Sequence, residues 1–373
     1  MGEGPLGGSL ELRRDGASEH PPARVPVAPR LRRLGRKLPP LRPEQLEIAG
    51  RGPDWVEANP RRIEAGLAYA KSLPSGGWYV LASKRSLGPG PRAFVIAGRE
   101  LVQWRGEDGE LRVAPDACPH MGAQLSTGRV CRGQLVCPWH GLELGDSPRG
   151  RWGTLPLFDD GVLIWVRLPE AGQIGSPRPF LPPRPEVYLD GVIELDGACE
   201  PDDVIANRLD PWHGVHFHPY SFAALSVTGG DERVLEMRVA KRLFGSACIE
   251  VDVTFHCSDP RTIVMTIVDG EGKGSVVETH ATPVGPGRCR IIEATLAGSD
   301  RPSFAQAPRV AALVRPFIRR AAQKLWVDDL AYAERRYALR SRAALEAAPA
   351  RETEGAASAA SAVAGASMAL DRD

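Results

Sequence analysis

The first part of the chain carries short apolar runs separated by turn-forming residues. Four of these runs have the length and the β-branched or aromatic content of strands, and turn pairs such as Asp108-Gly109 stand between them. The pattern therefore predicts a small antiparallel β domain. Its strands are expected at Trp78–Ala82, Ala93–Ile96, Glu100–Trp104 and Gly161–Val166.

The second part carries longer runs in which apolar and polar residues alternate. From Ile249 to Phe255 every second residue is apolar, which indicates a strand with one buried face. Strands are expected at Val187–Leu195, Val234–Val239, Ala247–His256, Thr262–Asp269, Ser275–Pro283 and Arg288–Leu296. Helical spacing predicts helices at Asp54–Ser72, Asp202–His213 and Pro308–Leu345, and Pro316 should kink the last one or divide it in two. A curved antiparallel sheet wrapped on a long C-terminal helix is an α+β fold, with a cavity between sheet and helix.

Composition divides the chain into six segments. The ends are rich in Pro and Arg or in Ala and Ser, and six prolines fall between Pro169 and Pro185, which is typical of disordered tails and of a semi-rigid connector. The expected order is a disordered arm 1–50, a helical lead-in 51–74, an all-β domain 75–168, a connector 169–186, an α+β domain 187–345 and a disordered tail 346–373.

Charge and cysteine content narrow the class of protein. The 373 residues carry a net charge of +1, so neither a nucleic acid nor an acidic membrane is expected as partner. No apolar run reaches the roughly 18 residues that a membrane span needs, and no apolar leader follows the N-terminus. The seven cysteines include five without framework spacing, and a reducing cytoplasm is expected to keep most of them as buried thiols; the five are Cys131, Cys199, Cys248, Cys257 and Cys289.

Two short motifs offer metal ligands in matched pairs. Cys118-Pro-His120-Met-Gly and Cys137-Pro-Trp-His140-Gly each supply one thiolate and one imidazole. Zinc modules mostly space two cysteines together before their histidines, so a zinc knuckle is the weaker alternative. The arrangement favours a two-iron cluster in which both cysteines hold one iron and both histidines hold the other.

On these motifs, residues 78–167 resemble a Rieske 2Fe-2S domain. Respiratory Rieske proteins carry a further cysteine in each loop, and the two form a disulfide. Here Trp139 stands between Pro138 and His140, and Cys131 has no partner at the family position. The domain therefore resembles the low-potential type of ring-hydroxylating oxygenases and Rieske ferredoxins.

The resemblance extends to a second metal motif. Asp210-x2-His213-x4-His218 matches the mononuclear iron motif of the Rieske non-haem iron oxygenases, and Asn207 stands at the family offset. Two histidines and one carboxylate hold Fe(II) on one face and leave open positions for O2 and substrate. His216, three residues after His213, is an alternative ligand but is expected to play a supporting role.

The third ligand is expected from a helix near the C-terminus. Asp329 and Glu334, with Asp328 as the preceding acid, fit the register of the family. Adjacent helical residues point about 100° apart, so only one of the two aspartates can face the iron. Asp329 is the favoured ligand, Asp328 is the alternative, and Glu334 is expected near the site.

In the family, an aspartate at the position of Asp210 bridges an iron histidine to a cluster histidine of a neighbouring subunit. This implies a catalytic role for Asp210 in electron transfer, and it requires a head-to-tail homotrimer.

The resemblance implies a terminal oxygenase component with a helix-grip-like catalytic domain. Electrons would pass from the 2Fe-2S cluster to Fe(II), which activates O2 to hydroxylate, demethylate or desaturate a hydrophobic small molecule, with an isoprenoid as one guess. No nucleotide fingerprint is present, so an external NAD(P)H-dependent reductase, a ferredoxin or both should supply the electrons. The alternative is a Rieske electron-transfer or sensor protein with an inactive iron site.

Overall fold

The computed structural model describes residues 59–168, 175–244 and 247–347. The predicted arm 1–50 lies outside these ranges, and so does the predicted tail apart from residues 346 and 347. The predictions of disorder at the two ends therefore concern residues that the structure does not describe. All described helices and strands belong to one compact unit, Pro43–Asp373.

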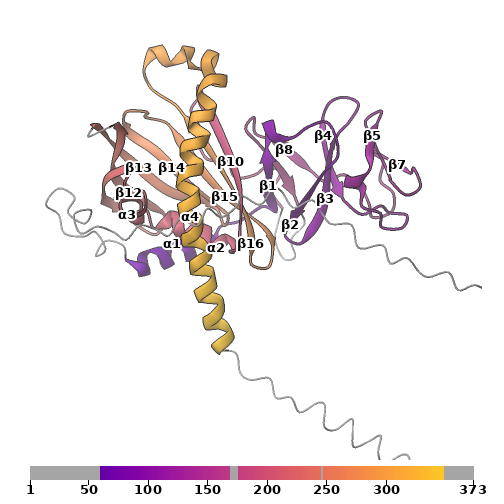
Figure 1. Cartoon of the computed structure of the whole chain (residues 1–373), viewed down its shortest axis with the longest axis horizontal. Coiled ribbons are helices and arrows are strands. Elements are labelled where there is room, and N and C mark those ends of the chain that lie inside the picture. The colour runs from indigo at the N-terminus through magenta and orange to yellow at the C-terminus, as the bar shows by residue number, and fades with distance from the viewer. Residues whose placement is uncertain (1–58, 169–174, 245–246, 348–373) are drawn as a thin grey trace, which may run out of the picture. The chain divides into compact units, whose positions relative to one another are not determined.

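Three small antiparallel sheets make up the first half, which runs from indigo to magenta in Figure 1. Their strand orders are β1-β9-β8, β2-β3-β4 and β5-β6-β7. The strands are β1 Trp78–Ser83, β2 Arg92–Ile96, β3 Arg99–Arg105, β4 Leu111–Pro115, β5 Arg129–Cys131, β6 Gln134–Val136, β7 Glu143–Leu144, β8 Leu157–Asp159 and β9 Leu163–Arg167, with short 3-10 turns η3 Lys84–Ser86 and η4 Leu125–Thr127. The four predicted strands are confirmed as β1, β2, β3 and β9.

A seven-stranded antiparallel sheet dominates the second half, in the order β10-β16-β15-β14-β13-β12-β11. Its strands are β10 Leu189–Gly197, β11 Phe222–Gly230, β12 Val234–Phe244, β13 Ala247–Asp259, β14 Thr262–Gly270, β15 Val276–Gly285 and β16 Arg288–Ala297. The predicted alternation is confirmed in β13, where Val251, Val253 and Phe255 are all buried. β11 is the one strand of this sheet that the sequence pattern does not predict.

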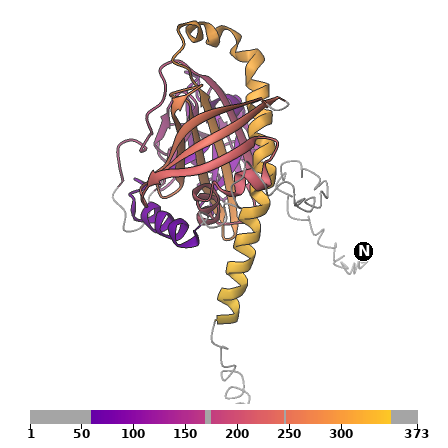
Figure 2. The ribbon, with the colours of Figure 1, turned by 90° about the vertical axis from the view of Figure 1, so that its left-hand side faces the viewer.

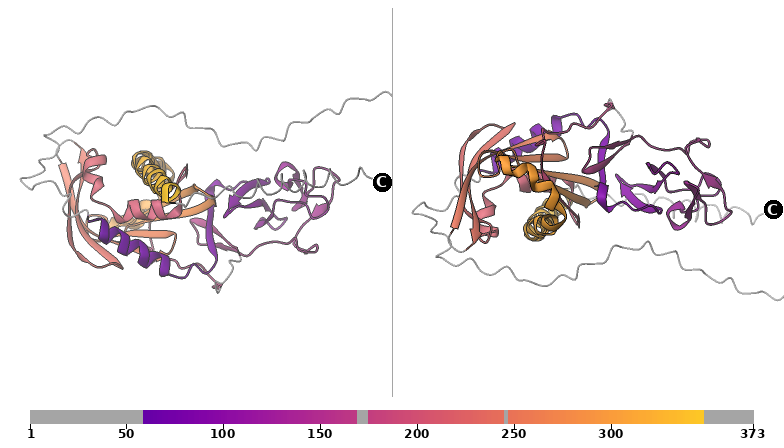
Figure 3. Two further views of the ribbon diagram at one scale, coloured as in Figure 1. Left: turned by 90° about the horizontal axis from the view of Figure 1, so that it is seen from below. Right: turned by 90° about the horizontal axis from the view of Figure 1, so that it is seen from above.

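The four α-helices of the described residues pack on one face of this sheet, because buried residues of each belong to the same core cluster as the inward residues of the strands. They are α1 Pro60–Ser72, α2 Pro201–Leu209, α3 His213–Phe217 and α4 Ala311–Ala347, and a 3-10 segment η5 Pro302–Val310 precedes α4. Figure 2 shows α4 running beside the strands, and Figure 3 shows it nearly end-on. None of the described helices is long and apolar enough to cross a membrane. The predicted α+β class, a sheet on a long C-terminal helix, is confirmed.

The predicted helix Asp202–His213 is wrong in its extent, because the structure divides it into α2 and α3. Pro211 lacks a backbone N–H, and it disfavours helical backbone angles in the residue before it. Asp210 accordingly has φ −111° and ψ 69° and ends α2. The break matters for the site described below, because it places the side chains of the two short helices at an angle to each other.

Pro316 does not divide the C-terminal helix, because α4 is continuous from Ala311 to Ala347. The proline lies in the second turn, where it removes only the hydrogen bond to the carbonyl of Ala312. Ala312 is exposed, so water can satisfy that carbonyl.

The sheet's other face contacts the first half of the chain. Residues of β1 and β9, among them Trp78 and Trp165, share a core cluster with Val192 of β10 and Ile292 of β16. The connector adds Arg184, whose guanidinium binds Asp160, in the turn between β8 and β9, and Glu278, in β15. The two halves are therefore held together by both apolar packing and a buried ionic cluster.

Candidate metal centres

The two Cys-His motifs form loops with the same hydrogen-bond pattern. In the first, between β4 and β5, the Cys118 N–H donates to the Ala123 carbonyl at 2.9 Å, and the Gly122 N–H donates to the Cys118 carbonyl at 2.8 Å. The second, between β6 and β7, repeats both bonds from Cys137 and Gly141. Gly122 and Gly141 have φ angles of 77° and 72°, which favour glycine. The matched spacing of the motifs thus produces two matched loops.

The two loops place their cysteines next to each other and their histidines next to each other. The buried thiols of Cys118 and Cys137 lie close to each other, since each affects the pKa of the other. The exposed imidazoles of His120 and His140 meet edge to face, with ring centroids 4.9 Å apart. A sulfur pair beside an imidazole pair fits a two-iron cluster in which each iron takes one pair, as the sequence predicts. A single zinc ion would instead need all four donors around one point.

The backbone of each loop acts to lower the pKa of its cysteine thiol. Burial raises the pKa of Cys118. Burial acts in the same direction on Cys137, but the N–H groups of Trp139 and His140 point at its sulfur and, on balance, lower the pKa of that thiol. Backbone donors aimed at a ligand sulfur stabilise its anionic, metal-binding form.

A buried aspartate supports the first loop, and sequence reasoning missed it. Asp116, at the end of β4, accepts from the backbone N–H and the hydroxyl of Ser126, both at 2.6 Å, and from Gln124 at 3.3 Å. These bonds connect the residues on either side of the Cys118 loop. They limit how far its ends can separate.

The second candidate centre joins two helices, α3 and α4. His213 begins α3, His218 follows its end, and Asp329 lies in α4. One carboxylate oxygen of Asp329 lies 2.9 Å from His213 Nε2 and 2.8 Å from His218 Nε2. Among the described residues these three form the only group whose possible ligand atoms all lie within 4.8 Å of one another. The predicted set is therefore brought together at one point.

Both histidines can present Nε2 to a metal ion. His213 Nδ1 donates to the carbonyl of Asp210, since a carbonyl can only accept. His218 Nδ1 faces the Tyr220 hydroxyl at 3.2 Å. With both Nδ1 atoms engaged, each Nε2, which lies against Asp329 in this structure, can give its lone pair to a cation when it carries no proton.

The pKa shifts fit a cation site. Burial raises the pKa of Asp329, but its bonds to His213 and His218 outweigh burial and hold that pKa well below its usual range. Burial lowers the pKa of His213, yet the Asp329 bond and charge raise it overall. The Asp329 carboxylate thus lies against both Nε2 atoms as an anion, at a position where a bound metal ion can replace a proton.

Asp328 points away from the three-ligand group. Its carboxylate accepts from the Tyr220 hydroxyl at 3.0 Å and lies 3.6 Å from His218 Nδ1, on the far side of the imidazole from Asp329. Asp329 is 1% exposed, so the helix turns that carboxylate inward. The alternative with Asp328 as ligand is not favoured by this geometry.

The remaining predicted residues lie at different distances from the group. Asn207 is fully buried, and its amide nitrogen lies 3.4 Å from His213 Nε2 and 3.5 Å from Asp329. His216 is half-buried in α3 and makes none of the contacts that join the group among the described residues. Glu334 accepts from the Ala198 N–H at 3.1 Å, which attaches α4 to the loop before α2.

Asp210 lies beside His213 rather than at its metal face. One of its carboxylate oxygens is 4.0 Å from His213 Nδ1 and accepts from Tyr332 at 3.1 Å. The other oxygen is buried and has no hydrogen-bond partner among the described residues. Burial raises the pKa of Asp210. Tyr332 was missed from sequence, although it stands three residues after Asp329 and therefore shares its helix face.

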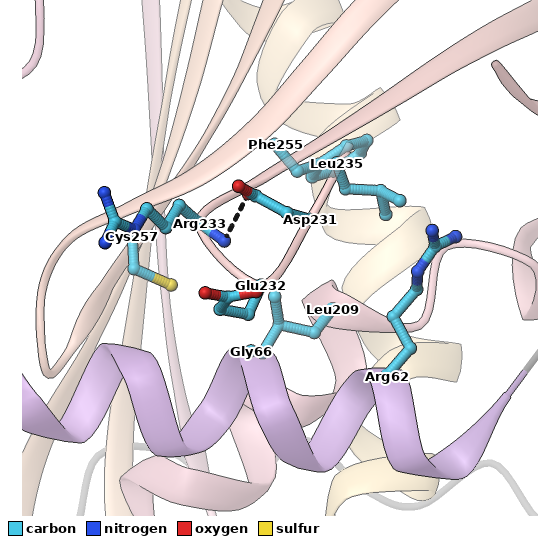
Figure 4. Close-up of a pocket in the computed structure, with 9 residues that line it drawn as sticks. All are labelled: Arg62, Gly66, Leu209, Asp231, Glu232, Arg233, Leu235, Phe255 and Cys257. Carbon is cyan, nitrogen blue, oxygen red and sulfur yellow. Dashed lines mark hydrogen bonds between the residues drawn. The ribbon is translucent and has the colours of Figure 1, made fainter. Parts of the chain in front are cut away.

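A crevice beside α1, drawn in Figure 4, is too small to hold a substrate. Its volume is about 10 Å³, which is room for about one water molecule. Arg62 and Gly66 of α1 lie on one side of it, and none of the three clustered ligands lines it.

Family comparisons match both halves of the chain. Residues 77–160 match the family described as Rieske 2Fe-2S domain, and residues 170–344 match a family described as a domain of unknown function, DUF5914. The first match covers both Cys-His loops, and the second covers His213, His218 and Asp329.

Curated relatives are oxygenase components. The chain is 39% identical over 194 residues to the vanillate O-demethylase oxygenase subunit of Pseudomonas sp. (strain HR199 / DSM 7063), covering 48% of this chain and 52% of that one. It is 29% identical over 189 residues to the 3-ketosteroid-9-alpha-monooxygenase oxygenase component of Rhodococcus rhodochrous, covering 43% and 45%. The match thus spans about half the length of each of these relatives.

The solved structure of dicamba monooxygenase bound to dicamba has the same fold. The TM-score is 0.56 at 19% identity, and the match covers 75% of this chain and 92% of that one. The predicted likeness to the Rieske oxygenases is confirmed in the cluster domain, among the relatives and in the fold.

Proposed function

We propose that this chain is the terminal oxygenase component of a Rieske-type system that oxidises a small molecule with O2. One observation carries the proposal: His213, His218 and Asp329 meet within 4.8 Å of one another in a chain that also carries a Rieske domain. A simple electron carrier would have no need for the second set of ligands. Relatives named as oxygenase components support the same function.

In this proposal Cys118 and Cys137 hold one iron of a 2Fe-2S cluster, and His120 and His140 hold the other. Gly122 and Gly141 have no Cβ, so the loop backbone can turn and bring its N–H groups close to the sulfurs. The exposure of both imidazoles leaves an edge of the cluster accessible to an external electron donor. A separate reductase, with or without a ferredoxin, is therefore part of the proposal.

We propose that His213, His218 and Asp329 hold a mononuclear Fe(II), with Asn207 as a neighbour that orients them. When bound, the two metal groups supply one-electron transfer and O2 activation. The chain's own residues fix the ligand geometry. The Asp210 carbonyl and the Tyr220 hydroxyl hold the two imidazole rings by Nδ1, and so both Nε2 atoms point to the same place.

Asp210 is proposed to connect the two metal groups of neighbouring copies. The cluster loops and the histidine motif belong to separate core clusters of the chain. A buried Asp210 oxygen without a donor among the described residues could accept from a cluster imidazole of a second copy. A head-to-tail trimer supplies that contact for every copy. The trimer, like a cytoplasmic location, is part of the proposal.

Iron stoichiometry tests the proposed function. The oxygenase should bind about three irons per chain, whereas an electron carrier or sensor with a dead site should bind about two. A His213→Ala/Asp329→Ala double variant should fall to about two and keep its Rieske electron paramagnetic resonance signal. His216→Ala is the matched control, since it removes a histidine of the same helix, and it should keep about three. A double variant that retains all its iron would overturn the ligand assignment.

Activity gives the second readout. With a reductase and a substrate, the wild type should consume O2 in proportion to product, and the double variant should not. Two irons per chain in the wild type, with no O2 consumption, would favour the electron-carrier alternative.

A further inference from the structure

A lysine interrupts the apolar inner face of the seven-stranded sheet. Every second residue of β12 from Leu235 to Val239 is buried in the core that faces the helices. Lys241 is next in that alternation and so lies on the same face. Its partner across the sheet is Phe222, whose ring centroid is 6.3 Å from that of His218. The lysine therefore lies in the neighbourhood of the proposed iron site.

A second cation reaches the same interior from α2. The Arg208 side chain is 17% exposed, and its guanidinium lies over the rings of Phe255 and Trp326, 5.9 Å and 6.0 Å from their centroids. Its one ion-pair contact among the described residues is with Asp329, at 4.0 Å. Both histidines contact Oδ1 of that carboxylate, and Arg208 faces Oδ2, so Arg208 shares its acidic partner with the proposed metal site.

Among the described residues, no ion pair joins either cation to an acid other than Asp329. Glu293 is a buried acid of this face, and one of its oxygens accepts from the Trp326 indole and from Thr279. Burial raises the pKa of Glu293, although the charge of Arg208 acts to lower it. Burial and the charge of Arg208 lower the pKa of Lys241, so the two cations repel each other. An anion brought from outside would offset that repulsion and favour the charged form of Lys241.

We propose that Arg208 and Lys241 form an anion-binding subsite beside the proposed iron, and that the substrate is an apolar molecule with a carboxylate group. The inference rests on the proposed function, because it names the substrate class of the same site. One guanidinium fork and one ammonium suit a single carboxylate. The apolar residues of the inner sheet face and the ring of Trp326 suit the rest of the molecule.

Equilibrium binding to the iron-loaded protein tests the subsite without any turnover. Two matched pairs of probes, decanoate against decanol and benzoate against benzamide, separate the carboxylate from the apolar body. Calorimetry should give at least one acid a tenfold or greater preference over its neutral partner. Arg208→Gln and Lys241→Met should each weaken acid binding about tenfold, or about 1.4 kcal/mol, and leave the neutral probe unchanged.

Arg242→Gln is the matched control. Arg242 is the next residue of β12 and is exposed, on the outward face, so its loss should change neither acid nor neutral binding. The iron content of each variant is measured alongside, and Lys241→Met keeps the test open if Arg208→Gln lowers the iron content.

Three outcomes would overturn the subsite: neither acid binds, the neutral probes bind as tightly as the acids, or the acid preference survives both variants. The last outcome would mean that the carboxylate binds the metal itself. The proposed function fails separately, on iron stoichiometry and O2 consumption. A protein with only two irons that still prefers acids through Arg208 and Lys241 would retain the subsite and lose the oxygenase.

Discussion

Replacement of Arg184 by methionine should destabilise the protein strongly at neutral pH. The guanidinium binds Asp160 at 2.9 Å and Glu278 at 2.6 Å, and both carboxylates are fully buried. Methionine keeps most of the apolar volume but removes the charge. Removing one partner of a buried ion pair leaves an uncompensated charge, which costs about 3–5 kcal/mol.

The hydrogen bonds that Asp160 and Glu278 keep without Arg184 give a more precise value for the loss of unfolding free energy. Asp160 keeps three donors at 2.7–2.8 Å, two backbone N–H groups and the Trp165 indole. Glu278 keeps only His280, at 3.3 Å, so Glu278 should take up a proton in the variant. Its ordinary pKa is 4.5. Binding a proton at pH 7, about 2.5 units higher and 1.36 kcal/mol per unit, costs about 3.4 kcal/mol.

The protonation of Glu278 determines whether the stability of each protein rises or falls with pH. Burial raises the pKa of Asp160 and Glu278 in the wild type, but Arg184 and, at Glu278, His280 lower both overall. The stabilisation by the ion pair is therefore present above the unfolded pKa and is lost as pH falls through the folded pKa. In the variant, Glu278 holds a proton only when folded, so stability falls as pH rises above about 4.5. The difference between the two proteins should shrink by about 1.4 kcal/mol for each pH unit below 7.

Guanidinium unfolding followed by circular dichroism at pH 7 and pH 5 measures both the size and the slope. Arg238→Met is the control, because Arg238 and Asp252 form a two-bond ion pair with side chains 55% and 32% exposed. Its loss should change the free energy of unfolding little, because exposed ion pairs contribute little to stability. A loss below about 1 kcal/mol for Arg184→Met at pH 7, or the same loss at both pH values, would refute the reasoning.

Three further predictions concern the site and one loop. Asp329→Asn should lower mononuclear iron affinity by at least about 100-fold while Asp328→Asn keeps it within about threefold, measured by iron titration; equal losses would contradict the inward position of Asp329. Tyr332→Phe removes the donor to Asp210 and should slow cluster oxidation about tenfold in a single turnover without loss of iron. Gly133→Ala should cost at least about 2 kcal/mol in unfolding experiments, since its φ is 71° and an added Cβ would lie 2.0 Å from a backbone nitrogen.

Much of the fold follows from patterns that lie within one element. The strongly apolar runs of β1 and β9 and the alternation of β13 predict strands, because each pattern reports burial of its own residues. The two-residue β7 gives no such signal. β11 mixes small and polar residues, and most of its side chains are only partly buried. Its pairing with β12 is a tertiary preference that its own sequence does not carry.

The candidate site also contains residues that one sequence motif predicts and residues that only the folded chain brings together. His213 and His218 stand in one short motif, whereas Asp329 lies 116 residues after His213, and only the resemblance to a family connected them. Arg208 and Lys241 lie on different elements, α2 and β12, so the sequence alone does not relate them. Lys241 nevertheless carried a signal, since the alternation of β12 places it on the apolar face.

The position of α4 is set by polar contacts on the face that carries Asp329. Tyr332, one turn on, donates to Asp210 at 3.1 Å, and Arg336, another turn on, binds the fully buried Asp203 of α2. Residues at these spacings share one face of a helix, so the same rotation of α4 satisfies all three. Sliding or turning the helix by one residue would break these bonds together. The carboxylate that completes the proposed iron site is therefore held in register by residues that need not touch the metal.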